Sequence, residues 1–203
     1  MRFSFPGFTI MYAISTVLCL ASAGMAWKRR NNPGSTPFAL LMLALATWSF
    51  SSIFEAGATT VVDKLTWSKW QYLGITNVAP FWILFTTEYT GRKKFQTKIL
   101  RLLLWIILAI TLILAFTNEF HGMVWSHISI IPGTITTGIY KRGTFFYIHT
   151  LFSYICLFFG TLWLIKNVLT DEKNRRFQSI IFIFGVIISW AVNLFYVLEL
   201  LPS

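Results

Sequence analysis

The feature that most constrains this chain is a series of six long stretches without Asp, Glu, Lys or Arg. Each stretch has 17 to 23 residues, and a helix needs about 20 mostly apolar residues to cross a bilayer. Transmembrane strands would instead alternate in polarity over about ten residues. The sequence therefore predicts an all-α integral membrane protein: one transmembrane domain, residues 1–203, folded as a polytopic bundle of six helices. The predicted helices are about 8–27, 36–55, 69–89, 100–118, 143–166 and 177–199.

Composition supports the membrane class and excludes several soluble ones. The formal net charge is +10, yet only 12% of the residues are charged and 56% are hydrophobic. A soluble nucleic-acid-binding protein with this net charge would carry many more solvated Lys and Arg residues. The chain has two cysteines, Cys19 and Cys156, which are too few for a disulfide-stabilised secreted module. We therefore expect membrane lipids, and no nucleic acid, among the partners.

The distribution of basic residues orients the predicted bundle. Twelve of the 17 Lys and Arg residues fall in the loops 28–35, 88–101 and 166–176. Because basic loops stay in the cytoplasm, we expect a multi-pass cell-membrane protein with an extracellular amino terminus. A cleaved signal peptide is the alternative for the first stretch, since residues 21–23 resemble a cleavage site. Signal peptides carry their positive charge before the apolar stretch, whereas here only Arg2 precedes it.

Local signals refine these elements. Two β-prone runs flank Pro132 and Gly133, which predicts a short extracellular β-hairpin around residues 126–142. Thr36 and Pro37 suit the capping and first positions of the second helix. At the other end of the bundle, Glu88 stands four residues before Arg92, the spacing of a helical ion pair.

One further residue, Pro80, lies within the third predicted helix and deletes a backbone hydrogen bond there, which predicts a bend or a local opening.

Polar side chains within the predicted helices concentrate towards the extracellular side. Polar groups in lipid are costly and normally face a bundle interior or a wet cavity. We therefore expect an outward-facing pocket for a small, partly apolar ligand. The alternative is that these side chains merely form hydrogen bonds between helices, and Glu55 could equally pair with Lys69. The candidate ligand-binding residues are His149, Asn193, Glu55, Trp190, Tyr196, Gln71, Asn77 and Tyr147.

Catalytic and metal-binding patterns are missing from the sequence. It has no glycine-rich phosphate loop, no paired cysteines at metal-ligand spacing and no nucleophile elbow. His121, His127 and His149 are too scattered to predict a metal site. We expect no enzymatic activity, metal or cofactor in this chain.

A set of ordered motifs runs along the whole chain. It consists of Trp48, Phe54 and Glu55; Trp70 to Gly74; Pro80, Trp82 and Glu88 to Gly91; Thr117, Asn118, His121 and Trp125; Tyr140, Gly143 and Tyr147; and Asn193 with Tyr196. Each motif alone is weak, but their order along the whole chain is fairly specific. This set resembles the N-terminal seven-transmembrane sensor region of histidine kinases.

This resemblance implies a membrane input module attached to a kinase or cyclase output domain, acting as a homodimer. The family has seven crossings and this sequence predicts six. Six crossings from an extracellular amino terminus end outside the cell, where no ATP or GTP is available for an output domain. We therefore expect the seventh helix and the output domain to be missing from this chain, with a parent that lacks an output domain as the alternative.

Two other function classes compete with a sensor. A small transporter or channel predicts inverted repeats or intramembrane charges along a route, and neither is visible in the sequence. A structural subunit of a larger membrane complex would use the high aromatic content, 18%, as packing surface. A sensor, which the resemblance implies, is the leading hypothesis. Ligand in an outer pocket would favour one helix arrangement over another and so transmit a signal.

Overall fold

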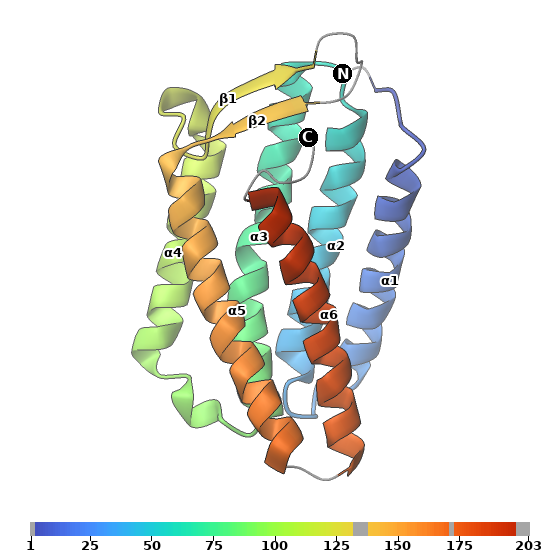
Figure 1. Ribbon diagram of the computed structural model, residues 1–203, viewed down its shortest axis with the longest axis vertical. Helices are drawn as coiled ribbons and strands as arrows, with labels where there is room; N and C mark the ends of the chain where they lie inside the picture. The colour runs from blue at the N-terminus through green and yellow to red at the C-terminus, as the bar shows by residue number, and fades with distance from the viewer. Residues whose placement is uncertain (1–2, 132–137, 171–172, 198–203) are drawn as a thin grey trace.

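The computed structural model describes residues 3–131, 138–170 and 173–197, except for the side chains at 173–175, 190, 192, 193 and 195–197. Within these residues the chain is mostly helical, with a two-stranded sheet across one end (Figure 1). The elements are α1 (Thr9–Lys28), α2 (Ser35–Gly57), α3 (Val61–Tyr89), η1 (Lys93–Phe95), α4 (Lys98–Phe116), η2 (Asn118–Phe120), β1 (Trp125–Ile130), β2 (Gly138–Arg142), α5 (Thr144–Thr170) and α6 (Lys173–Val197).

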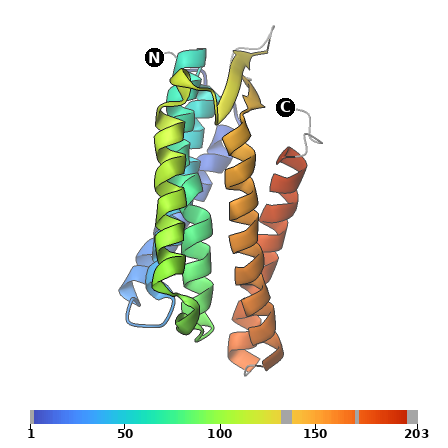
Figure 2. The same ribbon diagram turned by 90° about the vertical axis from the view of Figure 1, so that its left-hand side faces the viewer.

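Helix α3 is the centre of the bundle. It contacts α2, α4 and α5, while α1 packs on the far side of α2 and α6 packs against α5 (Figures 1 and 2). The core between α2, α3, α5 and α6 contains Leu41, Trp82, Phe85 and Leu164, with Phe182 packed against it. The connections from α1 to α2 and from α3 to α4 lie at the end opposite the sheet (Figure 1).

Four helices in the described part of the chain are long and apolar enough to cross a membrane: α1, α2, α4 and α5. In α6 the apolar stretch among the described residues is shorter, Arg176–Ser189. Helix α3 has 29 residues but carries Asp63, Lys64, Lys69 and Glu88. The predicted class, a helical membrane protein with a small hairpin, is confirmed at this level, while six crossings remain a prediction.

The first turns of α3 depart most from the predicted boundaries. We expected this helix to begin at about residue 69, but it begins at Val61. The Thr60 side chain caps it by accepting a hydrogen bond from the Asp63 backbone N–H, 3.1 Å, and donates to the Asp63 carboxylate, 2.9 Å. This reciprocal capping supports a helix start within a polar segment. The predicted boundary followed the uncharged stretch, whereas the first turns of the helix contain the charged residues Asp63, Lys64 and Lys69.

The predicted hairpin is confirmed as an antiparallel pair. Strand β1 pairs with β2 from Trp125 opposite Arg142 to Ile130 opposite Gly138, with one irregularity after Trp125. The turn expected at residues 132 and 133 lies outside the described residues. The hairpin covers the ends of α3 and α4 on one side of the bundle (Figure 1).

Asn118 fixes the hairpin to the end of α4. Its side-chain oxygen accepts hydrogen bonds from the backbone N–H groups of Val124 and Trp125, both 3.0 Å, and its amide donates to the Trp125 carbonyl, 2.9 Å. Trp125 in turn packs edge-on against Tyr72 of α3, with ring centroids 4.9 Å apart. This buried side chain makes three of its four possible hydrogen bonds to the start of β1 and so positions the strand over the helices.

Two local expectations are corrected. Helix α2 begins at Ser35 after Gly34, which has φ 83°, so Pro37 is the third helical residue and Thr36 donates to the Arg30 carbonyl instead of capping. At the carboxyl end of α3, Glu88 pairs with Lys93 at 3.5 Å rather than with Arg92. These differences are small shifts at helix ends, where alternative partners are close together.

As for Pro80, α3 runs as one helix from Val61 to Tyr89 with this proline inside it.

Candidate functional site

A buried polar cluster joins three elements at the hairpin end of the bundle. It contains Glu55 from the last turn of α2, Lys64 and Ser68 from the first turns of α3, and Tyr140 from β2; we call these four residues the hairpin-end cluster. The Lys64 ammonium lies 3.3 Å from the Glu55 carboxylate and donates to the Glu55 backbone carbonyl at 3.0 Å. The Tyr140 hydroxyl donates to the same Glu55 carboxylate oxygen.

Short connections and helical spacing bring these groups together. Only residues 58–60 separate α2 from α3, so the end of one helix faces the start of the next. Lys64 and Ser68 are four residues apart and therefore share a face of α3. The Ser68 hydroxyl lies 3.4 Å from the Tyr140 hydroxyl, which places the hairpin over that face.

Burial makes the ion pair in this cluster energetically significant. Lys64 is 1% exposed and the Glu55 side chain 18% exposed. A buried charge must be paired and hydrogen-bonded, and removal of one partner of such a pair costs about 3–5 kcal/mol. The hairpin-end cluster therefore ties the α2–α3 connection and β2 into one unit.

The polar contacts continue from this cluster along the α2–α3 interface. Gln71 donates to the Ser52 hydroxyl at 3.2 Å. Between Lys64 and Gln71, the Trp67 ring stacks on Phe54 with centroids 4.3 Å apart. The Trp67 indole nitrogen is buried, and among the described residues it has no hydrogen-bond acceptor. A buried donor of this kind is rare in native structures, so it marks a position where a ligand could supply an acceptor.

His149 lies in a different interface, between α3, α4 and α5. It is 5% exposed, and its two ring nitrogens each lie 3.4 Å from a hydroxyl, that of Thr111 and that of Ser153. Its ring centroid is 6.3 Å from that of Tyr72. Gln71 and Tyr72 are adjacent in sequence, so their side chains leave α3 in different directions. Glu55 and Gln71 therefore belong to one polar group and His149 to another.

Of the remaining predicted residues, Asn77 and Tyr147 do not join these two groups. Asn77 donates to the Leu73 carbonyl of its own helix at 2.8 Å. Tyr147 is 51% exposed and its ring packs on Phe146. The side chains of Trp190, Asn193 and Tyr196, on the last turns of α6, lie outside the described residues.

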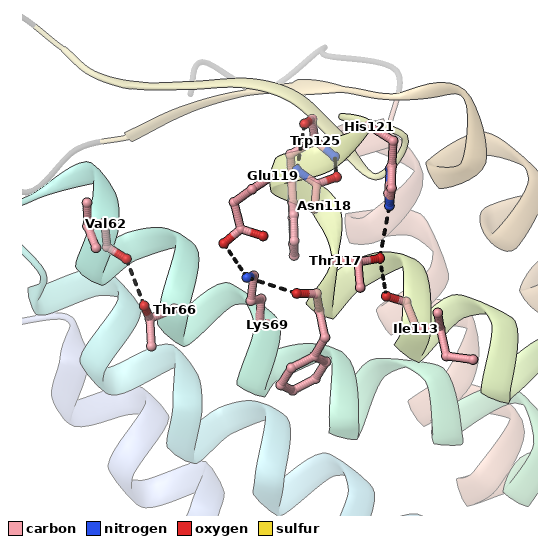
Figure 3. Close-up of polar contacts among 10 residues, drawn as sticks. Val62, Thr66, Lys69, Ile113, Thr117, Asn118, Glu119, His121 and Trp125 are labelled. Carbon is pink, nitrogen blue, oxygen red and sulfur yellow. Dashed lines mark hydrogen bonds and ion pairs between the residues drawn. The ribbon is translucent and has the colours of Figure 1, made fainter.

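The suggested pairing of Glu55 with Lys69 is wrong, because Lys69 has other partners. It pairs with the Glu119 carboxylate, as Figure 3 shows. It also donates to the Phe116 carbonyl at 3.1 Å. The hydrogen bond from Lys69 lowers the pKa of the Glu119 carboxyl below its ordinary value. This second ion pair joins α3 to the turn after α4, and it is more exposed than the pair formed by Lys64.

A broad surface hollow of about 490 Å³ lies beside this second ion pair. None of the five predicted site residues with described side chains lines it. Its wall is formed by Val61, Leu65, residues 118–122 and residues 125–128. In the described part of the chain, no group of three or more His, Cys, Asp or Glu residues is arranged to hold a metal ion.

Sequence reasoning missed Lys64, Trp67 and Ser68 as members of the site. The signal that could have found them is the pair Thr60 and Asp63, the spacing of a helix cap before a run of helical residues. A helix beginning there would have placed Lys64, Ser68 and Gln71 on one face. Tyr140 was noted in the motif set, but without a role.

One comparison with known proteins gives a match. A family model described as the N-terminal 7TM region of histidine kinase matches residues 11–203. Among curated proteins and among solved structures, none matches the chain significantly.

Proposed function

Because the chain belongs to the family of N-terminal 7TM regions of histidine kinases, we propose that it detects a signal at the hairpin end of the bundle and passes it through the membrane. A region of this family is an input domain and is not itself catalytic. Its output is the activity of a cytoplasmic histidine kinase domain, and the functional unit is a homodimer.

The proposed topology places the hairpin end outside the cell. The support is the separation of charge: the basic connections 28–35 and 90–98 lie at the opposite end from the sheet (Figure 1), which is the end that stays in the cytoplasm under the positive-inside rule. Six crossings follow if α3 and α6 span the membrane together with the four most apolar helices.

Labelling of single cysteines tests this topology. In a background with Cys19 and Cys156 replaced by serine, Ser126→Cys in β1 should react with a membrane-impermeant reagent added to intact cells. Lys94→Cys in η1 should react only after the membrane is opened. Both positions are exposed on the protein, so the opposite pattern would contradict the proposed orientation.

The observation that carries the function is the hairpin-end cluster. It connects the hairpin to the two helices that pack most extensively on each other, α2 and α3. A ligand that binds one arrangement of these elements more tightly than another shifts their equilibrium by its differential affinity. The cluster is therefore placed to convert an event at the hairpin into a movement of helices.

The proposed ligand is small, partly apolar and able both to accept and to donate a hydrogen bond. The Trp67 indole N–H and the Gln71 amide would donate to it, and the Glu55 carboxylate would accept from it. The stacked rings of Phe54 and Trp67 would supply the apolar ones. His149 is a second candidate, and Trp190, Asn193, Tyr196, Asn77 and Tyr147 stay as untested predictions.

The functional test compares two carboxylates that both lie at the hairpin end of the bundle. Glu55→Gln and Glu119→Gln each remove one ion-paired carboxylate, but only Glu55 belongs to the hairpin-end cluster. In the full-length kinase in membranes, we expect Glu55→Gln to change the basal autophosphorylation rate several-fold and Glu119→Gln to change it less than twofold. Equal effects at matched protein levels would contradict the assignment of the cluster as the signalling element.

A further inference from the structure

The turn between α3 and α4 carries an excess of positive charge that no acid of the described chain balances. Residues 92–101 include five basic residues and no acidic one. The nearest carboxylate, Glu88, pairs with Lys93. Among the described residues, no ion pair joins Lys94, Lys98 or Arg101 to a carboxylate, and all three are exposed.

The turn is held in a fixed shape by side-chain contacts. Gln96 is buried and donates to the Leu84 carbonyl at 3.2 Å and to the Thr87 hydroxyl at 2.7 Å. The Gln96 side-chain oxygen lies 3.4 Å from the Arg101 guanidinium. On the other side of the turn, Phe95 stacks on Trp163 of α5, with ring centroids 5.6 Å apart. These contacts therefore fix the backbone positions from which the basic side chains extend.

An exposed apolar surface begins directly beside these charges. Lys98, Arg101, Leu102 and Trp105 follow one another at helical spacing on α4. Leu102 is 59% exposed and Trp105 is 44% exposed. Ile99, Leu103 and Ile106 on the same helix are also exposed. A cationic turn thus continues into an apolar helix surface of the kind that faces lipid.

From this juxtaposition we propose that the α3–α4 turn binds the headgroup of an anionic phospholipid. The phosphate lies among Lys94, Lys98 and Arg101, and the acyl chains lie along the exposed apolar side of α4. A free phosphate would satisfy the charges and leave the apolar surface unused, whereas a phospholipid satisfies both. Each Lys or Arg near an anionic membrane surface contributes about fivefold to affinity. The site requires only that the chain is a helical membrane protein, and it holds whichever side of the membrane the turn faces.

A charge-matched pair of variants tests this site. Lys94→Gln with Lys98→Gln removes two exposed lysines of the turn and leaves the Gln96 contacts intact. Lys28→Gln with Arg29→Gln, the α1–α2 variant, removes the same charge at the exposed carboxyl end of α1. Purified protein in detergent is titrated with phosphatidylglycerol and with phosphatidylcholine, and the bound lipids are counted by native mass spectrometry.

We expect the wild type and the α1–α2 variant to bind phosphatidylglycerol more tightly than phosphatidylcholine. The turn variant should bind phosphatidylglycerol about 25-fold more weakly, at about fivefold per charge. Equal losses in both double variants would show a response to net charge and overturn the site. Inorganic phosphate serves as a competitor. If the site bound free phosphate as tightly as the phospholipid, so that phosphate displaced the lipid, the proposal would also be overturned, because the apolar half would then contribute nothing.

Discussion

The Tyr140 hydroxyl donates a hydrogen bond to the Glu55 carboxylate, although 85 residues separate the two positions in the sequence. Glu55 lies in the last turn of α2 and Tyr140 in the second strand of the hairpin, so this bond joins the hairpin to a long apolar helix. Lys64 completes the arrangement from α3. A hydrogen bond to a charged group contributes about 1.5–3 kcal/mol, enough to bias the position of a small hairpin.

Gly74 allows a close approach between α2 and α3. A Cβ atom at this position would lie 2.4 Å from the Ala44 carbonyl oxygen and 2.6 Å from the Trp48 nitrogen. Gly74→Ala should therefore destabilise the protein by about 1–3 kcal/mol, the usual cost of overpacking. The thermal unfolding midpoint in detergent measures this effect. Gly24→Ala in α1 is the matched control, because nothing lies within 4 Å of its Cβ position; an equal loss in both variants would contradict the close approach.

Asn118→Ala should release the hairpin from the end of α4. The change leaves the Val124 and Trp125 backbone N–H groups without their acceptor, and each buried unsatisfied group costs about 1–3 kcal/mol. Hydrogen exchange at these two amides should accelerate strongly, while amides in the middle of α3 keep their protection. Asn32→Ala, at an exposed position between α1 and α2, should leave the hairpin amides unchanged. Unchanged exchange in Asn118→Ala would remove the proposed anchor.

The Lys69–Glu119 ion pair predicts a pH-dependent contribution to stability. The hydrogen bond from Lys69 lowers the pKa of the folded Glu119 carboxyl below its ordinary value of 4.5. The contribution is therefore complete above that ordinary value and is lost as the pH falls through the lowered folded value. The stability difference between wild type and Glu119→Gln should shrink across this acidic window, and also at high salt.

A double-variant cycle controls this prediction. If Lys69 is the cause, the pH-dependent difference disappears in a Lys69→Gln background. A difference that persists there would assign the effect to another neighbour of Glu119.

The hairpin could be predicted from sequence because its signals are local. Alternating β-prone residues on either side of Pro132 and Gly133 need no knowledge of the rest of the fold. The beginning of α3 could not be found from hydropathy, since Lys64 tolerates burial only because Glu55 and its carbonyl are close. That proximity arises from tertiary structure and cannot be read from hydropathy. The one local signal for the beginning of α3 is the capping pair Thr60 and Asp63.

The predicted pocket shows the limit of reasoning from membrane depth. Depth along a helix follows from residue number, so Glu55, Gln71 and His149 were grouped by their level in the bilayer. The direction of each side chain depends on the rotation of its helix and on its neighbours. The structure places Gln71 towards Ser52 and His149 towards Thr111. A common level therefore did not imply a common site.

The most direct test of the signalling account replaces one hydroxyl group. Tyr140→Phe keeps the ring and removes the hydrogen bond to Glu55, while Tyr12→Phe makes the same change at an exposed position of α1 outside the hairpin-end cluster. The measurement is the basal autophosphorylation rate of the full-length kinase in membranes, at matched protein levels. We expect a change of several-fold for Tyr140→Phe and a wild-type rate for Tyr12→Phe. A wild-type rate for Tyr140→Phe would contradict the claim that the hairpin-end cluster carries the signal.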